Sequence, residues 1–152
     1  MLLPADFKEF IELMISEGVR FVMIGGFAYN LYRNPRATGD IDFLVEANSE
    51  TEQRMRTVLV KFGFGETLTE SKLLEKGKVV MLGRSPFRID ILTELSGVRS
   101  EEVFDSVQHH LLDGLNVPVI SPEILLKNKE ATGREKDAGD IIELRRLLSG
   151  DD

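Results

Sequence analysis

Two aspartates separated by one isoleucine lie in an apolar run that follows a pair of glycines. Residues 24–44 read IGGFAYNLYRNPRATGDIDFL, with Asp40 and Asp42 near the end. If this run is a strand, both carboxylates project from the same face, because strand side chains alternate with a period of two. Two neighbouring carboxylates repel each other unless a cation or a proton lies between them. The pair therefore predicts a cation site.

The chemistry of the pair is narrowed by the cation that it would suit and by the glycines upstream. Magnesium takes oxygen ligands, usually one or two carboxylates completed by water and substrate phosphates. Thirteen residues separate Gly26 from Asp40. A turn such as Gly25-Gly26 at the start of a helix lets a phosphate approach backbone N–H groups. Together these features predict chemistry on a nucleotide phosphate that depends on Mg²⁺ or Mn²⁺.

Around these residues the sequence predicts alternating helices and strands, followed by hairpins and two helices. Asp6 with Glu9, and Ser49 with Glu52, are predicted capping boxes. The predicted elements are helix 7–17, strand 21–24, helix 27–32, strand 41–45, a helix from Ser49 that Gly63 ends, strands 78–82 and 87–92, helix 100–106, strands 107–112 and 115–120, a helix from Pro122 to about Thr132, and helix 135–148. This order predicts an α+β fold with a mixed sheet flanked by helices.

Composition places the chain among ordinary globular proteins. Its 152 residues predict a single domain, 1–152, with a core over about 7–120 and C-terminal helices over about 121–148. No apolar run approaches the roughly 18 residues of a membrane span, and the N-terminus lacks a signal-peptide pattern, so we expect a cytoplasmic protein without membrane contact. A net charge of −7 disfavours a broad nucleic-acid-binding face.

The acidic pair and the glycines also carry a resemblance to a known family. An apolar residue before Gly-Gly, a thirteen-residue spacing and the Asp-apolar-Asp-apolar run resemble the signature of the nucleotidyltransferase superfamily with a DNA polymerase β-like palm. In that family a third carboxylate lies on a later strand, and Asp90 in the run FRIDIL matches it. The fold implied is the mixed sheet of the nucleotidyltransferase palm.

The C-terminal segment extends this resemblance over residues 7–148. Residues 121–141, SPEILLKNKEATGREKDAGDI, are similar to small bacterial nucleotidyltransferase-like proteins. Those include members of abortive-infection and minimal-nucleotidyltransferase systems, and enzymes that modify aminoglycosides and lincosamides. The resemblance implies that Asp40, Asp42 and Asp90 are the catalytic acids and metal ligands. It also implies that Lys129 contacts the phosphates or the nucleotide.

Physical chemistry agrees with these roles. Two metals about 3.5–4 Å apart can hold the attacking and leaving oxygens of a nucleotidyl transfer. Asp40 and Asp42 would bridge them, and Asp90 would help to hold the metal that activates the acceptor hydroxyl. Gly25 and Gly26 would donate N–H groups to the triphosphate.

Several residues keep two interpretations. Arg36 and Thr38 either belong to a solvated loop or bind phosphate, for which arginine is well suited. Lysines such as Lys129 usually face solvent on a helix, and the resemblance makes this one a candidate phosphate ligand. For Arg134, Asp137 and Asp140 we expect an ion-pair cluster that joins the last two helices.

The leading hypothesis is a nucleotidyltransferase that moves a nucleoside monophosphate from a nucleoside triphosphate to the hydroxyl of a small molecule, a protein or an RNA. Because 152 residues leave little room for an acceptor domain, either a homodimer shares the acceptor site or the acceptor is a macromolecule. The alternative is an inactive nucleotidyltransferase fold that binds a partner in a toxin–antitoxin system. A purely structural acidic cluster would have no metal affinity. A P-loop ATPase and a serine hydrolase are disfavoured, because their motifs are absent from the sequence.

Overall fold

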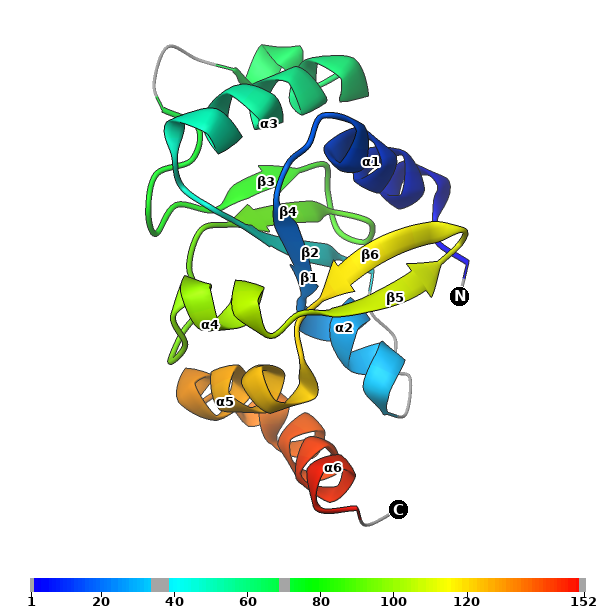
Figure 1. The fold of residues 1–152 in the computed structure, drawn as a ribbon, viewed down its shortest axis with the longest axis vertical. Coiled ribbons are helices and arrows are strands. Elements are labelled where there is room, and N and C mark those ends of the chain that lie inside the picture. Colours follow the sequence, from blue (N-terminus) through cyan, green and yellow to red (C-terminus); the bar gives the residue numbers. More distant parts are fainter. Residues whose placement is uncertain (1, 34–38, 69–71, 151–152) are drawn as a thin grey trace.

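A single mixed sheet organises the computed structural model, which describes residues 2–33, 39–68 and 72–150. The order of its six strands is β3-β4-β2-β1-β6-β5. Helices flank the sheet, and the β5–β6 hairpin extends from it (Figure 1). The predicted α+β class with a mixed sheet is confirmed.

The helices and strands follow the predicted order along the chain. Their bounds are α1 Ala5–Ser16, β1 Phe21–Ile24, α2 Gly25–Tyr32, β2 Ile41–Val45, α3 Ser49–Phe62, a 3₁₀ turn η1 Gly65–Thr67, β3 Val80–Leu82, β4 Ile89–Leu92, α4 Ser100–Asp105, β5 Gln108–Leu112, β6 Leu115–Val119, α5 Pro122–Thr132, a 3₁₀ turn η2 Glu135–Asp137 and α6 Ala138–Ser149. None of the helices in the described ranges has both the length and the apolar character that a bilayer crossing requires.

The centre of the sheet combines antiparallel and parallel pairs. Strand β2 runs antiparallel to β1 and parallel to β4, and β1 runs parallel to β6. The two predicted hairpins are present, because β3 pairs antiparallel with β4 and β5 with β6. The parallel pairing of β2 with β4 brings together two segments that are far apart in the sequence.

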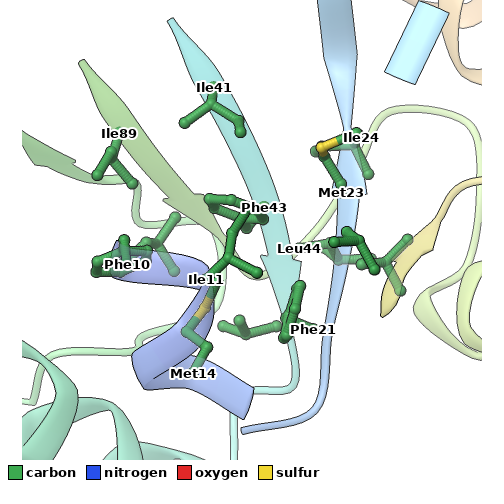
Figure 2. Packing of buried hydrophobic residues seen from close by; sticks show 14 of the residues in the cluster. Phe10, Ile11, Met14, Phe21, Met23, Ile24, Ile41, Phe43, Leu44 and Ile89 are labelled. Carbon is green, nitrogen blue, oxygen red and sulfur yellow. The ribbon is translucent and has the colours of Figure 1, made fainter. Parts of the chain in front are cut away.

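One face of the sheet packs against α1 and forms the main core. Figure 2 shows Phe10, Ile11 and Met14 of α1 facing Phe43 of β2, with Phe21 of β1 beside them. The rings of Phe10 and Phe43 are 6.0 Å apart between centroids. Helix α3 joins this layer, since Phe62 meets Phe10 edge-to-face at 5.1 Å. Burial of this side therefore holds β2 and leaves its alternate residues, including Asp42, for the other face.

The C-terminal helices lie on the far side of the molecule from α1 and α3 (Figure 1). Helix α5 begins as predicted at Pro122, and Ser121 is its N-cap, whose hydroxyl accepts the Ile124 N–H at 3.4 Å. Arg33, at the end of α2, pairs with Glu143 of α6 at 3.0 Å. This ion pair fixes α6 beside α2.

Two predicted capping boxes are wrong. Helix α1 begins at Ala5 with Pro4 as its N-cap, so Asp6 lies inside the first turn. Helix α3 is capped by Asn48, whose side chain accepts the Thr51 N–H at 2.8 Å. Glu52 instead accepts the N–H groups of Leu73 and Leu74, at 3.1 and 2.8 Å, and is buried. The carboxylate of Glu52 thus binds two loop amides far along the chain, and the local spacing of residues does not reveal such long-range hydrogen bonds.

Candidate active site

Asp42 and Asp90 lie directly beside each other on neighbouring parallel strands. The register pairs Asp42 of β2 with Asp90 of β4, and Ile24 of β1 with Asp42. Paired residues share a face of the sheet, so both carboxylates point away from the α1 layer. Asp40 immediately precedes β2 and lies at the same end of these strands. The structure therefore brings together the three acids that the sequence singles out.

Arg88 holds two of these acids, and the sequence analysis missed it. Its Nε and Nη2 donate to Oδ1 and Oδ2 of Asp90 at 2.7 and 2.9 Å, a two-pronged contact typical of arginine with carboxylates. Its Nη2 also lies 3.6 Å from Oδ2 of Asp40. Hydrogen bonding and the charge of Asp90 raise the pKa of Arg88. The available signal was the Arg-Ile-Asp spacing, which puts the two side chains on one strand face.

The pKa values of Asp42 and Asp40 are shifted in opposite directions. Burial, together with the neighbouring charge of Asp90, raises the pKa of Asp42 to about 6. For Asp40, partial desolvation is outweighed by the hydroxyl of Ser85, which donates at 2.7 Å, and the N–H of Arg88, which donates at 3.0 Å. These donors lower the pKa of Asp40. The site thus holds one carboxyl that resists ionisation beside two that accept hydrogen bonds from Arg88 or its neighbours.

The glycine turn lies against Asp42. Gly25 begins α2 with a φ of +70°, a conformation that favours glycine. A Cβ atom at this position would lie 2.4 Å from Oδ2 of Asp42. Gly26 follows in the first turn of α2 and lines the same cleft. Gly25 therefore has a steric role that the sequence did not suggest, since its missing side chain makes room for the acid.

Basic side chains from the C-terminal helices complete the cleft, which has a volume of about 360 Å³. Lys129 of α5, Arg134 and Lys136 line it together with the glycines, Asp40, Asp42, Arg88, Asp90 and Asp137. Lysines and arginines near the start of a helix, opposite a pair of acids, suit an anion that also carries a cation. Lys136 is exposed and was not singled out from the sequence.

Lys129 is buried in an ion-pair cluster at the back of the cleft. Its side chain is 4% exposed, and Nζ lies 3.0 Å from Oδ2 of Asp140 and 3.3 Å from Oδ1 of Asp137. Arg134 donates from Nε to Asp137 at 2.8 Å. The predicted cluster of Arg134, Asp137 and Asp140 is present, and Lys129 is at its centre. A contact between Lys129 and a phosphate stays a prediction.

Two other predicted phosphate ligands, Arg36 and Thr38, lie outside the described residues. Within the described ranges, a hollow of about 610 Å³ also occurs at the opposite ends of β1 and β2, bordered by Arg20, Glu46 and Phe104. Arg20 pairs there with Glu46 and lies 4.5 Å above the Phe104 ring. This hollow lies away from the acids, because Arg20 precedes β1 whereas Gly25 follows it.

The donor atoms of the cleft suit a divalent cation only in part. Across residues 2–33, 39–68 and 72–150, no three acidic or histidine side chains converge closely enough to hold a metal ion together. Arg88 occupies both oxygens of Asp90, and Ser85 binds Asp40. Magnesium, however, needs only one or two carboxylates when phosphates supply other ligands. The raised pKa of Asp42 reflects burial and a surplus of negative charge that a cation would neutralise. Asp42 therefore fits such an ion, and Asp90 would share it once its contacts with Arg88 change.

Solved structures of low sequence identity share the fold. A lincomycin-bound lincosamide antibiotic adenylyltransferase, LnuA, aligns with a TM-score of 0.60 and 15% identity over 96% of this chain and 98% of its own. A putative nucleotidyltransferase from Thermotoga maritima aligns with a TM-score of 0.62 and 16% identity, over 95% of this chain and 91% of its own. The antibiotic-resistance factor ANT(2'')-Ia aligns with a TM-score of 0.61 and 13% identity, over 95% of this chain and 82% of its own. No curated protein sequence matches the chain.

The mixed sheet flanked by helices is thus a nucleotidyltransferase fold. The family is shown by a family model described as "Nucleotidyl transferase of unknown function (DUF2204)", which matches residues 5–150. The chain belongs to this family and is a transferase enzyme.

Proposed function

We propose that this protein transfers a nucleoside monophosphate from a nucleoside triphosphate to a hydroxyl group, with the help of Mg²⁺ or Mn²⁺. The observation that carries the proposal is the direct pairing of Asp42 with Asp90 across β2 and β4. The pair lines a cleft that Lys129, Arg134 and Lys136 also line, together with Asp137, the ion-pair partner of the first two. A triphosphate with its cation has the complementary pattern of charge.

The reaction makes one bond and breaks another at the α-phosphorus. The acceptor oxygen joins this phosphorus, the bond to the bridging oxygen breaks, pyrophosphate leaves, and the hydroxyl proton passes to solvent. Asp42 would hold the divalent cation of the triphosphate, and Asp90 would help to hold the cation at the acceptor hydroxyl. The cations would supply neutralising charge and make the hydroxyl more acidic. Asp40 belongs to the same acidic end and would assist once its contacts with Ser85 and Arg88 change.

The remaining wall of the cleft receives the phosphates. Gly25 and Gly26 present the first turn of α2, where unpaired backbone N–H groups and the positive end of the helix dipole favour an anion. Arg134 and Lys136 line the same cleft from the C-terminal segment. Lys129 lies behind them, where it can hold the wall in place as well as meet a phosphate.

The names of two similar structures favour a small-molecule acceptor. One is an adenylyltransferase that has lincomycin bound, and the other is an antibiotic-resistance factor. A small acceptor also agrees with the net charge of −7, which opposes the approach of RNA. We therefore place a small molecule ahead of a protein or an RNA.

Isothermal titration with a nonhydrolysable triphosphate, with and without Mg²⁺, tests the binding half of this proposal. The wild-type protein should bind at least tenfold more tightly with Mg²⁺, because the phosphates complete the ligand shell of the ion. Asp42→Asn should lose this gain and keep the metal-free affinity. Asp105→Asn, the same change on the exposed surface of α4, is the matched control. Triphosphate affinity that is the same with and without Mg²⁺ would contradict the proposal and favour the partner-binding alternative.

A further inference from the structure

The acid pair divides the catalytic face of the sheet into two sides. Gly25 and Gly26 follow β1, and Lys129, Arg134 and Lys136 come from the C-terminal helices, so the basic wall lies on the β1 side of β2. On the other side of β2 the order continues through β4 to the edge strand β3. In a transfer at phosphorus the attacking and leaving oxygens are roughly in line. If pyrophosphate leaves toward the basic wall, the acceptor hydroxyl arrives over β4 and β3.

Two apolar side chains on that side are exposed. Met81 of β3 pairs directly with Asp90, so the two side chains share the catalytic face. Met81 is 57% exposed, although its neighbours Val80 and Leu82 are buried in the core. Val79, two residues before Met81, is also exposed, at 40%. The side chains of Met81 and Val79 thus lie beyond Asp90, along the edge of the sheet.

We infer that Met81 and Val79 form the platform on which the acceptor lies, and that the acceptor carries its reactive hydroxyl beside an apolar group. This inference rests on the proposed function and specifies its substrate class. Met81 is the first side chain beyond Asp90 on the acceptor side, and methionine adapts to irregular apolar ligands. Contact with Met81 would place a hydroxyl next to Asp90. A highly charged acceptor would gain nothing from Met81 and Val79.

Methionine methyl NMR gives a binding test that does not depend on turnover. The chain has five methionines, and Met14, Met23 and Met55 are fully buried. The probes are methyl β-glucoside and hexyl β-glucoside, which offer the same hydroxyls and differ only in apolar length. With Mg²⁺ and a nonhydrolysable triphosphate present, hexyl glucoside should shift the Met81 signal and leave the buried signals unchanged. Each buried methylene is worth about fourfold in affinity, so hexyl glucoside should bind at least tenfold more tightly than methyl glucoside.

Variants connect the preference to Met81. Met81→Asp should weaken hexyl glucoside binding at least tenfold, whereas Met81→Leu, which retains an apolar side chain, should preserve the preference. Val60→Asp is the matched control, because Val60 is also 57% exposed but lies on α3. Triphosphate affinity should stay within twofold of wild type in Met81→Leu and Val60→Asp, since neither change adds charge beside the acids and neither residue lines the phosphate cleft.

The following results would overturn the inference. Equal affinity for the two glucosides would remove the apolar preference, and equal effects of Met81→Asp and Val60→Asp would remove Met81 from the site. A wild-type dimer that Met81→Asp dissociates in sedimentation velocity would show that a second copy covers this face.

If the wild-type protein binds no triphosphate, the proposed function itself fails. If it binds triphosphate but Met81 gives no response, this inference alone fails.

Discussion

Asp42 is the acid whose ionisation opposes folding most clearly. Its pKa is raised to about 6, from an ordinary value near 4, by burial and by the charge of Asp90. The folded protein therefore holds this proton more tightly than the unfolded chain does. It follows that the contribution of Asp42 to stability is lost as the pH rises from about 4 to about 6.

Replacing Asp42 with asparagine should stabilise the protein at neutral pH. Asparagine has no charge to desolvate, and its amide can donate to Asp90. We expect Asp42→Asn to raise the free energy of unfolding at pH 7.5 by about 1–2 kcal/mol, or roughly 2–8 °C in Tm. At pH 4 the two proteins should melt together. Thermal denaturation across this pH range measures the difference, and a variant that is equally less stable at both pH values would contradict the interpretation of Asp42.

Gly25 offers a second residue-scale prediction, because it combines a positive φ with close contact to Asp42. Gly25→Ala should cost about 1–2 kcal/mol from the backbone alone, and it should also displace Asp42 and weaken triphosphate binding with Mg²⁺ at least tenfold. Gly63 has a φ of +94°, and a Cβ atom added there would meet no other atom within 4 Å. Gly63→Ala should therefore lose similar stability and keep the binding. Equal binding by both variants would remove Gly25 from the site.

The same residues show what sequence reasoning could find. Asp42 and Asp90 were identifiable, because acids inside apolar runs are unusual and the spacing of the first pair from Gly25-Gly26 is distinctive. Arg88 was not identified, since an arginine on a strand ordinarily faces solvent. Its two hydrogen bonds to Asp90 depend on side-chain geometry that spacing alone does not specify.

At the scale of elements, the junction of α5, η2 and α6 is held by buried charge. Lys129→Met would leave Asp140 without its ammonium partner, although Asp137 keeps Arg134 and Thr132. Removing one partner of a buried ion pair typically costs about 3–5 kcal/mol. We expect a loss of about 3 kcal/mol in chemical denaturation, at the lower end of that range. Lys127→Met, on the same helix but 54% exposed, should change stability by less than about 0.5 kcal/mol.

Lys136 separates phosphate binding from this structural role. Because Lys136 is exposed, Lys136→Ala should leave stability unchanged and weaken triphosphate binding about three- to tenfold, with a smaller loss at high salt. Titration calorimetry at low and high salt measures the effect. Triphosphate affinity equal to wild type would show that the phosphates do not reach η2.

Element boundaries followed local signals where these were strong and failed where tertiary contacts intervened. Ser121-Pro122 marked the start of α5, and Gly63 marked the end of α3 with a left-handed cap. The predicted capping box at Ser49 is absent because the carboxylate of Glu52 accepts a hydrogen bond from Leu73, 21 residues further along the chain. The last helix is preceded by the 3₁₀ turn η2, which a helical periodicity over 135–148 does not distinguish.

At the scale of the whole molecule, the decisive contact is the parallel pairing of β2 with β4. Sequence patterns predicted both strands but not their adjacency, since 47 residues separate Asp42 from its partner. Only the resemblance to a nucleotidyltransferase palm put the third acid beside the first two. The shared fold at 13–16% identity shows that very different sequences support this arrangement of strands. The roles of the acids in catalysis remain predictions.

Transfer of label from an α-³²P nucleoside triphosphate to a small hydroxyl acceptor tests the central claim most directly. The assay compares wild type with Asp90→Asn, for each of the four bases and with Mg²⁺ and Mn²⁺, and follows labelled product and released pyrophosphate. Because Asp42 and the glycine turn can hold the triphosphate, Asp90→Asn should keep its affinity within about threefold. Turnover should fall at least a hundredfold, as expected when an interaction matters mainly in the transition state. Undiminished transfer by Asp90→Asn, or no transfer by either protein under any of these conditions, would contradict the account.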